Sequence, residues 1–194
     1  MAGLRMKIDK VSMDRVGQLL GDMTTRMSIL TPAFKAMGKV FRTAMGAIFA
    51  SAPPSSGSLG KDVRQKMAGG ETVTADPGYA FVGYSGVQWR LLNPAYAAWK
   101  LRRAGQVPIL WLTGEMARSF TQVGNPDYIE RIAPDHAEFG SKNIRAYYHQ
   151  EAGVGKSRVK RQIIKMTAAE EDQFVDIFGA YVIANDPERG VKGR

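Results

Sequence analysis

The 194-residue chain contains no cysteine. This excludes disulfide bonds, thiolate metal sites and a cysteine nucleophile. The chain also lacks an apolar run of about 18 residues, so we expect no segment that spans a membrane. Arg5, Lys7 and Asp9 interrupt the first residues, which lack the apolar region of a signal peptide. These absences are compatible with a protein made in a reducing cytoplasm.

The motifs of common catalytic sites are also missing. Gly153–Ser157 resembles the end of a phosphate-binding loop, but Gln150 stands where that loop needs its first glycine. Ser119 has no Gly-x-Ser-x-Gly around it. His136 and His149 do not have the spacing of metal ligands; His149 could be a ligand or a general base, but such a residue more often hydrogen-bonds a turn. We therefore expect no enzymatic activity, no metal and no cofactor.

Acidic residues are few relative to basic ones: 18 Asp and Glu against 27 Lys and Arg give a net charge of +9. Such a charge suits nucleic acid, an anionic membrane surface or an acidic protein partner. The basic residues concentrate at Lys156, Arg158, Lys160, Arg161 and Lys165, and again in the tail at Arg189, Lys192 and Arg194. No aromatic stacking platform accompanies either group. One hypothesis is therefore a small basic protein that binds nucleic acid non-specifically.

The first 50 residues predict two helices. Val16, Leu19, Leu20, Met23 and Met27 recur at helical spacing, with a start at Lys10 or Ser12. Thr31 and Pro32 read as the N-cap and first-turn proline of a second helix that ends near Ala50. We expect both methionine-rich faces to form core or a subunit interface. Residues 51–78 are rich in Ser, Pro and Gly, which is typical of a loop that orders against a neighbouring subunit or of simple disorder.

The second half mixes short strands with helices. Its expected elements, in chain order, are a strand at Tyr79–Tyr84, a helix from Pro94, a short helix capped by Thr113, strands at Thr121–Val123, Tyr128–Ile132, Ala137–Phe139 and Gln162–Met166, and a last helix opened by a Thr167–Glu170 capping box and ended by Asn185–Pro187. The fold class is α+β, a small antiparallel sheet of about four strands packed by N-terminal, central and C-terminal helices. The predicted organisation is a helical region (1–50), a linker (51–78), an α+β core domain (79–184) and a basic, unstructured tail (185–194).

Several segments together resemble one protein family. The matching positions are Trp89–Lys100, then Ile109, Leu112, Thr113, Gly114, Met116 and Ser119, then Tyr147, His149, Gln150 and Gly153, and finally Lys165–Thr167 before the last helix. Over residues 80–184 this pattern resembles the tail-completion, or virion-morphogenesis, proteins of tailed bacteriophages of the Mu and P2 type. The chain departs from that pattern at 156–161, where the family's Pro and Phe are missing and Arg158 or Arg161 stands nearest to its Arg.

The resemblance implies a structural virion protein that completes the tail and joins it to the filled head. It implies a homo-oligomeric ring, expected to be hexameric, around the DNA channel. The neighbours would be neck, adaptor or portal, and tail-tube or terminator proteins, with non-specific contact to packaged DNA. The location would be the virion, reached from the host cytoplasm. The candidate interface and channel residues are Trp89, Trp99, Trp111, His149, Lys156, Arg158, Lys160 and Arg161.

Overall fold

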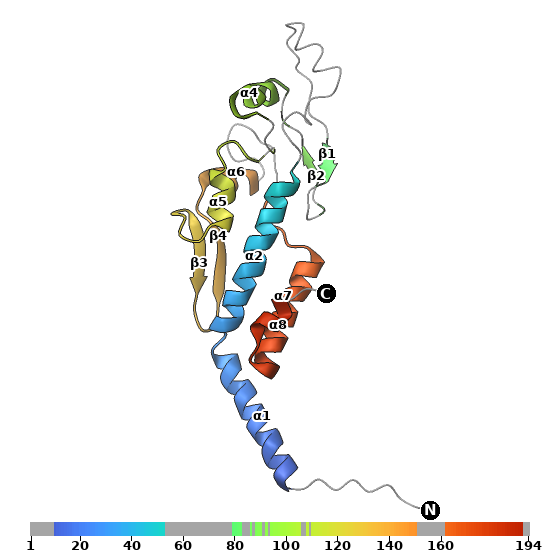
Figure 1. Cartoon of the computed structure of the whole chain (residues 1–194), viewed down its shortest axis with the longest axis vertical. Helices are drawn as coiled ribbons and strands as arrows, with labels where there is room; N and C mark the ends of the chain where they lie inside the picture. Colours follow the sequence, from blue (N-terminus) through green and yellow to red (C-terminus); the bar gives the residue numbers. More distant parts are fainter. Residues whose placement is uncertain are drawn as a thin grey trace, which may run out of the picture.

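The computed structural model describes residues 10–52, 79–82, 86, 88–90, 92, 94–105, 108, 110–150 and 162–191. In chain order its elements are α1 (Lys10–Ser28), α2 (Thr31–Ser51), β1 (Tyr79–Val82), β2 (Gln88–Arg90), α4 (Pro94–Ala104), α5 (Glu115–Thr121), β3 (Tyr128–Ile132), β4 (Ala137–Ser141), α6 (Ile144–Gln150), α7 (Ala168–Ala184) and α8 (Pro187–Val191). The class is α+β and mostly helical. Figure 1 shows an elongated arrangement, with α1 at one end and α4 and α6 at the other.

Helix α2 is the centre of the fold. It lies between the β3–β4 hairpin with α5 on one side and α7 with α8 on the other (Figure 1). One cluster joins its Phe41, Met45 and Phe49 to Phe120 of α5 and to Ile163. A second cluster joins the N-terminal half of α2 to α7 and α8. The apolar spacing of α2 thus buries side chains on two faces, as a helix enclosed by neighbours requires.

The predicted sheet of about four strands is not confirmed. Within the described residues the strands form two separate antiparallel pairs, β1 with β2 and β3 with β4. Tyr128–Ile132 and the strand beginning at Ala137 were predicted correctly. The expected strand Thr121–Val123 is wrong because Thr121 is the last residue of α5, where its hydroxyl donates to the carbonyl of Ala117. The expected strand Gln162–Met166 has no strand partner among the described residues; its backbone is bonded by a side chain instead.

The helices also differ from the sequence prediction in four places. Ala146–Gln150, for which the sequence predicted no element, lies in α6. Leu30, not Thr31, is the N-cap of α2. Gly114, in the left-handed conformation, is the N-cap of α5 in place of Thr113. Asn185 ends α7 as predicted, but α8 follows within the tail that was expected to be unstructured. The Thr167–Glu170 capping box is confirmed, with the Thr167 N–H donating to Glu170 Oε2 over 2.6 Å.

Candidate functional site

A small cavity of about 110 Å³ lies where α4, the segment before α5 and α6 meet. Its described lining consists of Tyr96, Lys100, Leu110, Leu112, Thr113, Gly114, Met116, Arg145 and His149. Three of these carry basic groups, and none of the described lining residues is acidic. Pockets for drug-sized ligands typically measure about 300–1,000 Å³, so this cavity suits a small chemical group.

Lys100 is the most buried charged side chain of the described residues, with 1% of its surface exposed. Its Nζ donates a hydrogen bond to the carbonyl of Pro108 at 2.7 Å. This bond fixes the position of the amino group at the wall of the cavity. Lysine is almost never this buried in proteins unless its charge is compensated. The wall of the cavity therefore contains a buried, hydrogen-bonded lysine side chain.

A left-handed glycine shapes the floor of the cavity next to α5. Gly114 has φ 77°, a conformation that glycine adopts without the steric penalty of a Cβ. A Cβ added there would lie 3.0 Å from the ring of Trp111 and 2.8 Å from Nη1 of Arg118. The Trp111 ring thus packs directly on the Gly114 backbone. This close packing is possible only because residue 114 has no side chain.

Helix α6 supplies the other two basic groups of the cavity. Arg145 and His149 are four residues apart, so they lie on the same helix face. Arg145 Nη1 is 3.5 Å from Glu115 Oε2, and both side chains are more than half exposed. Such an exposed ion pair contributes about 0–1 kcal/mol. Arg145 is therefore held only weakly at the rim.

The start of α6 is fixed by a chain of short polar contacts. Ser141 donates to Ser119 over 2.7 Å, and Ser119 donates to the carbonyl of Met116. Asn143 accepts a bond from the Arg145 N–H with its Oδ1. Its Nδ2 donates to a carboxylate oxygen of Asp127. Ser119 is buried in the middle of these hydrogen bonds and links α5 to the turn before α6.

The structure gathers three of the candidate residues around this cavity. His149 lines it, Trp111 packs on its Gly114, and Trp99 stacks on its Tyr96 with ring centroids 5.4 Å apart. Trp89 lies in β2, and its side chain is outside the described part of the structure. Lys156, Arg158, Lys160 and Arg161 also lie outside it.

Sequence reasoning did not single out the cavity's Lys100 and Arg145. Lys100 sits among basic residues in the last turns of α4, where a favourable interaction with the helix dipole explains it without burial. Ala97 lies about one turn earlier in α4 and is fully buried. Its burial shows that the helix face carrying Lys100 points inward. Arg145 and His149 share a face because residues 144–150 form α6, a helix that the sequence did not predict.

The second histidine lies elsewhere, in the turn between β3 and β4. His136 is exposed, and its Nδ1 is 2.8 Å from Asp135 Oδ1. This hydrogen bond, with the attraction of the imidazole, lowers the pKa of Asp135 below 3.8. The described residues contain no group of three or more His, Cys, Asp or Glu side chains placed to hold a metal ion.

Comparisons with known proteins return no match: no family model, no curated protein and no solved structure is similar to this chain. Within the described parts of the chain, no helix combines the length and hydropathy needed to cross a bilayer.

Proposed function

We propose that this chain is a structural subunit of a tailed-phage neck, which assembles with copies of itself in tail completion and head–tail joining. The residue pattern of Trp89–Lys100, Ile109–Ser119 and Tyr147–Gly153 supports the phage assignment by its resemblance. The observation that carries the assembly role is the exposed apolar face of α1.

Helix α1 projects from the rest of the described structure (Figure 1). Its apolar stripe is largely exposed. Met13, Val16, Leu20 and Met27 are 51–58% exposed, and Leu19 beside them is 48% exposed. Met23 is partly buried and reaches the α2–α7 cluster. The stripe from Met13 to Met27 has alternating spacings of three and four residues, which is the pattern of helices that pack knobs into holes. Exposed apolar surface of this kind marks an interaction site.

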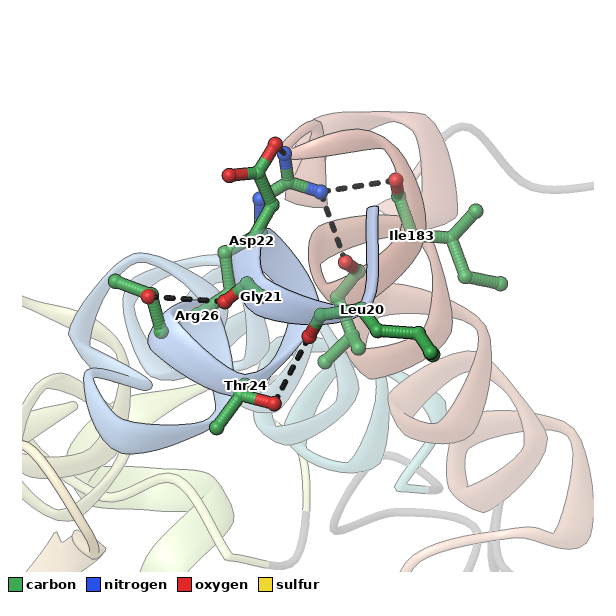
Figure 2. Close-up of polar contacts among 8 residues, drawn as sticks. Leu20, Gly21, Asp22, Thr24, Arg26 and Ile183 are labelled. Carbon is green, nitrogen blue, oxygen red and sulfur yellow. Dashed lines mark hydrogen bonds and ion pairs between the residues drawn. The ribbon is translucent and has the colours of Figure 1, made fainter. Parts of the chain in front are cut away.

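The base of α1 is fixed to the body. Figure 2 shows the Arg26 guanidinium reaching the last turn of α7, where Nη1 donates to the carbonyls of Val182 and Ile183 over 2.9 Å each. Those carbonyls belong to the helix end, where cations are favourable and backbone acceptors are unsatisfied. Tyr181 Oη donates to the carbonyl of Ile29 just beyond α1, over 2.6 Å. Helix α1 is thus anchored at its C-terminal end, and its apolar face is exposed along the rest of its length.

The occupant we propose for this face is a second copy of the chain. The charged residues of α1 include the acidic Asp14 and Asp22 and the basic Lys10, Arg15 and Arg26. Two copies of this helix therefore form attractive as well as repulsive charge pairs. A ring forms when each copy places such a face on its neighbour and the rotation closes. Self-association through α1 is the step on which the neck function depends.

The test is size-exclusion chromatography with light scattering on the purified chain across a concentration series. Leu20→Asp puts a carboxylate into the proposed contact, so we expect it to weaken self-association at least about tenfold. The matched control is Gln18→Asp, which adds the same charge to the same helix at an exposed position off the stripe. We expect the Gln18→Asp chain to assemble like wild type.

Circular dichroism melting establishes that both variants remain folded. A wild-type chain that stays monomeric at every concentration contradicts the proposal. Equal loss in the two variants contradicts it as well, because the effect then comes from charge and not from the apolar stripe.

A further inference from the structure

Helix α4 has its large aromatic side chains on the outside. Ala97 and Lys100 are buried on its inner face, whereas Tyr96 and Trp99 are 45% and 41% exposed. A helix that packs on a core ordinarily buries such rings, and exposed apolar surface marks an interaction site. We propose that this outer face of α4 binds single-stranded nucleic acid. The inference goes beyond the assembly proposed above and concerns the opposite end of the molecule from α1 (Figure 1).

The two aromatic rings of this face stack on each other. The ring centroids of Tyr96 and Trp99 are 5.4 Å apart, and the ring planes are inclined by 23°. Both side chains nevertheless remain more than two-fifths exposed. Exposed rings of this kind can take unpaired bases by stacking, and they do so with little sequence preference because every base has a flat π-face. The pair therefore offers a stacking surface for a strand.

Two arginines follow the aromatic pair along the helix. Arg103 lies two turns after Tyr96 and one turn after Trp99, so these residues share one helix face about 10 Å long. Arg102 lies beside Arg103. Both arginine side chains are exposed, and no carboxylate of the described residues forms an ion pair with either. Arginine is always charged in proteins, and its planar fork of N–H donors binds phosphate oxygens in pairs.

This combination of groups fits a single strand better than other anionic partners. A single strand presents flat bases beside its phosphates, and the face presents flat rings beside its guanidinium groups. A duplex keeps its bases stacked inside, away from the Tyr96–Trp99 pair. An acidic protein supplies carboxylates for the arginines but no series of flat rings. Helix α4 contains no acidic residue, so no charge within the helix repels a phosphate.

The test is fluorescence anisotropy of a labelled oligothymidylate of about ten nucleotides, titrated with the full chain. We expect saturable binding with a Kd of about 100 μM or tighter in about 0.1 M salt. Trp99→Leu removes the ring and keeps the apolar bulk, so binding should weaken at least about fivefold. Trp99→Phe keeps an aromatic ring and should retain most of the affinity. A merely structural role of the apolar side chain does not separate these two variants.

The salt dependence of binding tests the arginines. For a single strand, the slope of log affinity against log salt concentration changes by about 0.7 for each phosphate contact. The double variant Arg102→Gln/Arg103→Gln should therefore reduce the magnitude of this slope by about 1.4. The matched control is Arg131→Gln/Arg189→Gln, which removes the same charge from exposed positions on β3 and α8. The control should keep the wild-type slope.

Circular dichroism melting establishes that every variant remains folded. Absence of saturable binding, the result expected if the face takes an acidic protein, overturns the proposal. So does equal binding by Trp99→Leu and Trp99→Phe, or an equal change of slope in the two double variants. A duplex of the same length that binds as tightly as the single strand also overturns it. Because oligonucleotide binding and self-association are measured separately, failure here leaves the proposal on α1 standing.

Discussion

At the scale of single residues, one polar triad ties the central helix to the hairpin. Arg42 of α2 donates from Nη1 to Tyr128 Oη over 3.0 Å and to Glu130 Oε2 over 2.8 Å. Tyr128 in turn donates to the same carboxylate oxygen. Burial raises the pKa of Tyr128 above 10.0, and its hydrogen bond to Glu130 raises it further, while Arg42 acts in the opposite direction. The neutral phenol is therefore the form that the folded chain favours.

This shift predicts a pH dependence of stability. Because the folded pKa of Tyr128 exceeds the unfolded value, its contribution is fully present below pH 10 and is lost as pH rises through the folded pKa. Urea denaturation of wild type and Tyr128→Phe between pH 8 and about pH 11 measures it. We expect the stability advantage of wild type to be constant at first and to shrink above about pH 10. An advantage that grows with pH contradicts the assignment.

At the scale of elements, an amide side chain replaces a strand partner. Gln150, at the end of α6, accepts with Oε1 from the Ile163 N–H over 2.8 Å and from the Ile164 N–H over 3.0 Å. Its Nε2 donates to the Ile164 carbonyl. These are the bonds that a neighbouring strand makes in a sheet. They explain why 162–166, with the composition of a strand, is extended yet unpaired with any described strand.

The prediction for this contact is a loss of stability on substitution. Gln150→Leu leaves the N–H of the fully buried Ile163 without its acceptor, which should cost about 1–3 kcal/mol of unfolding free energy. Gln122→Leu is the matched control, because Gln122 is exposed and follows α5, and its effect should stay within about 0.5 kcal/mol. Denaturant melts monitored by circular dichroism measure both. Equal effects would show that Gln150 is no substitute for a strand partner.

The element types that followed from local chemistry were predicted correctly. The long apolar spacing of α2, the Pro94 start of α4 and the Thr167–Glu170 capping box each depend on residues close together in the chain. Helix α6 was not predicted, because Tyr147 and Tyr148 favour strands locally, while the turn at Asn143 and the packing of Ala146 impose a helix. Tertiary contacts of this kind are not visible in a single sequence.

At the scale of the whole molecule, the exposed helix α1 and the small cavity lie at opposite ends (Figure 1). The apolar face of α1 lies at one end, and the basic cavity between α4 and α6 lies at the other (Figure 1). The sequence predicted the apolar stripe of α1 but left open whether it is core or interface, because its exposure depends on which other elements pack against it. The cavity was beyond prediction, since Lys100, Arg145 and His149 come together only through the fold. His149 and Trp111 were singled out from the family resemblance and not from cavity chemistry.

The central claim is tested most directly by electron microscopy of virus particles assembled with the gene for this chain silenced. The account predicts DNA-filled heads and complete tails that remain separate, because the joining subunit is missing. Restoring wild type should rejoin them, and restoring Leu20→Asp should not. Normal, joined virions from the silenced gene would contradict a role in tail completion. In that event the net charge of +9 favours the alternative function, non-specific binding of nucleic acid, which weakens as the salt concentration rises.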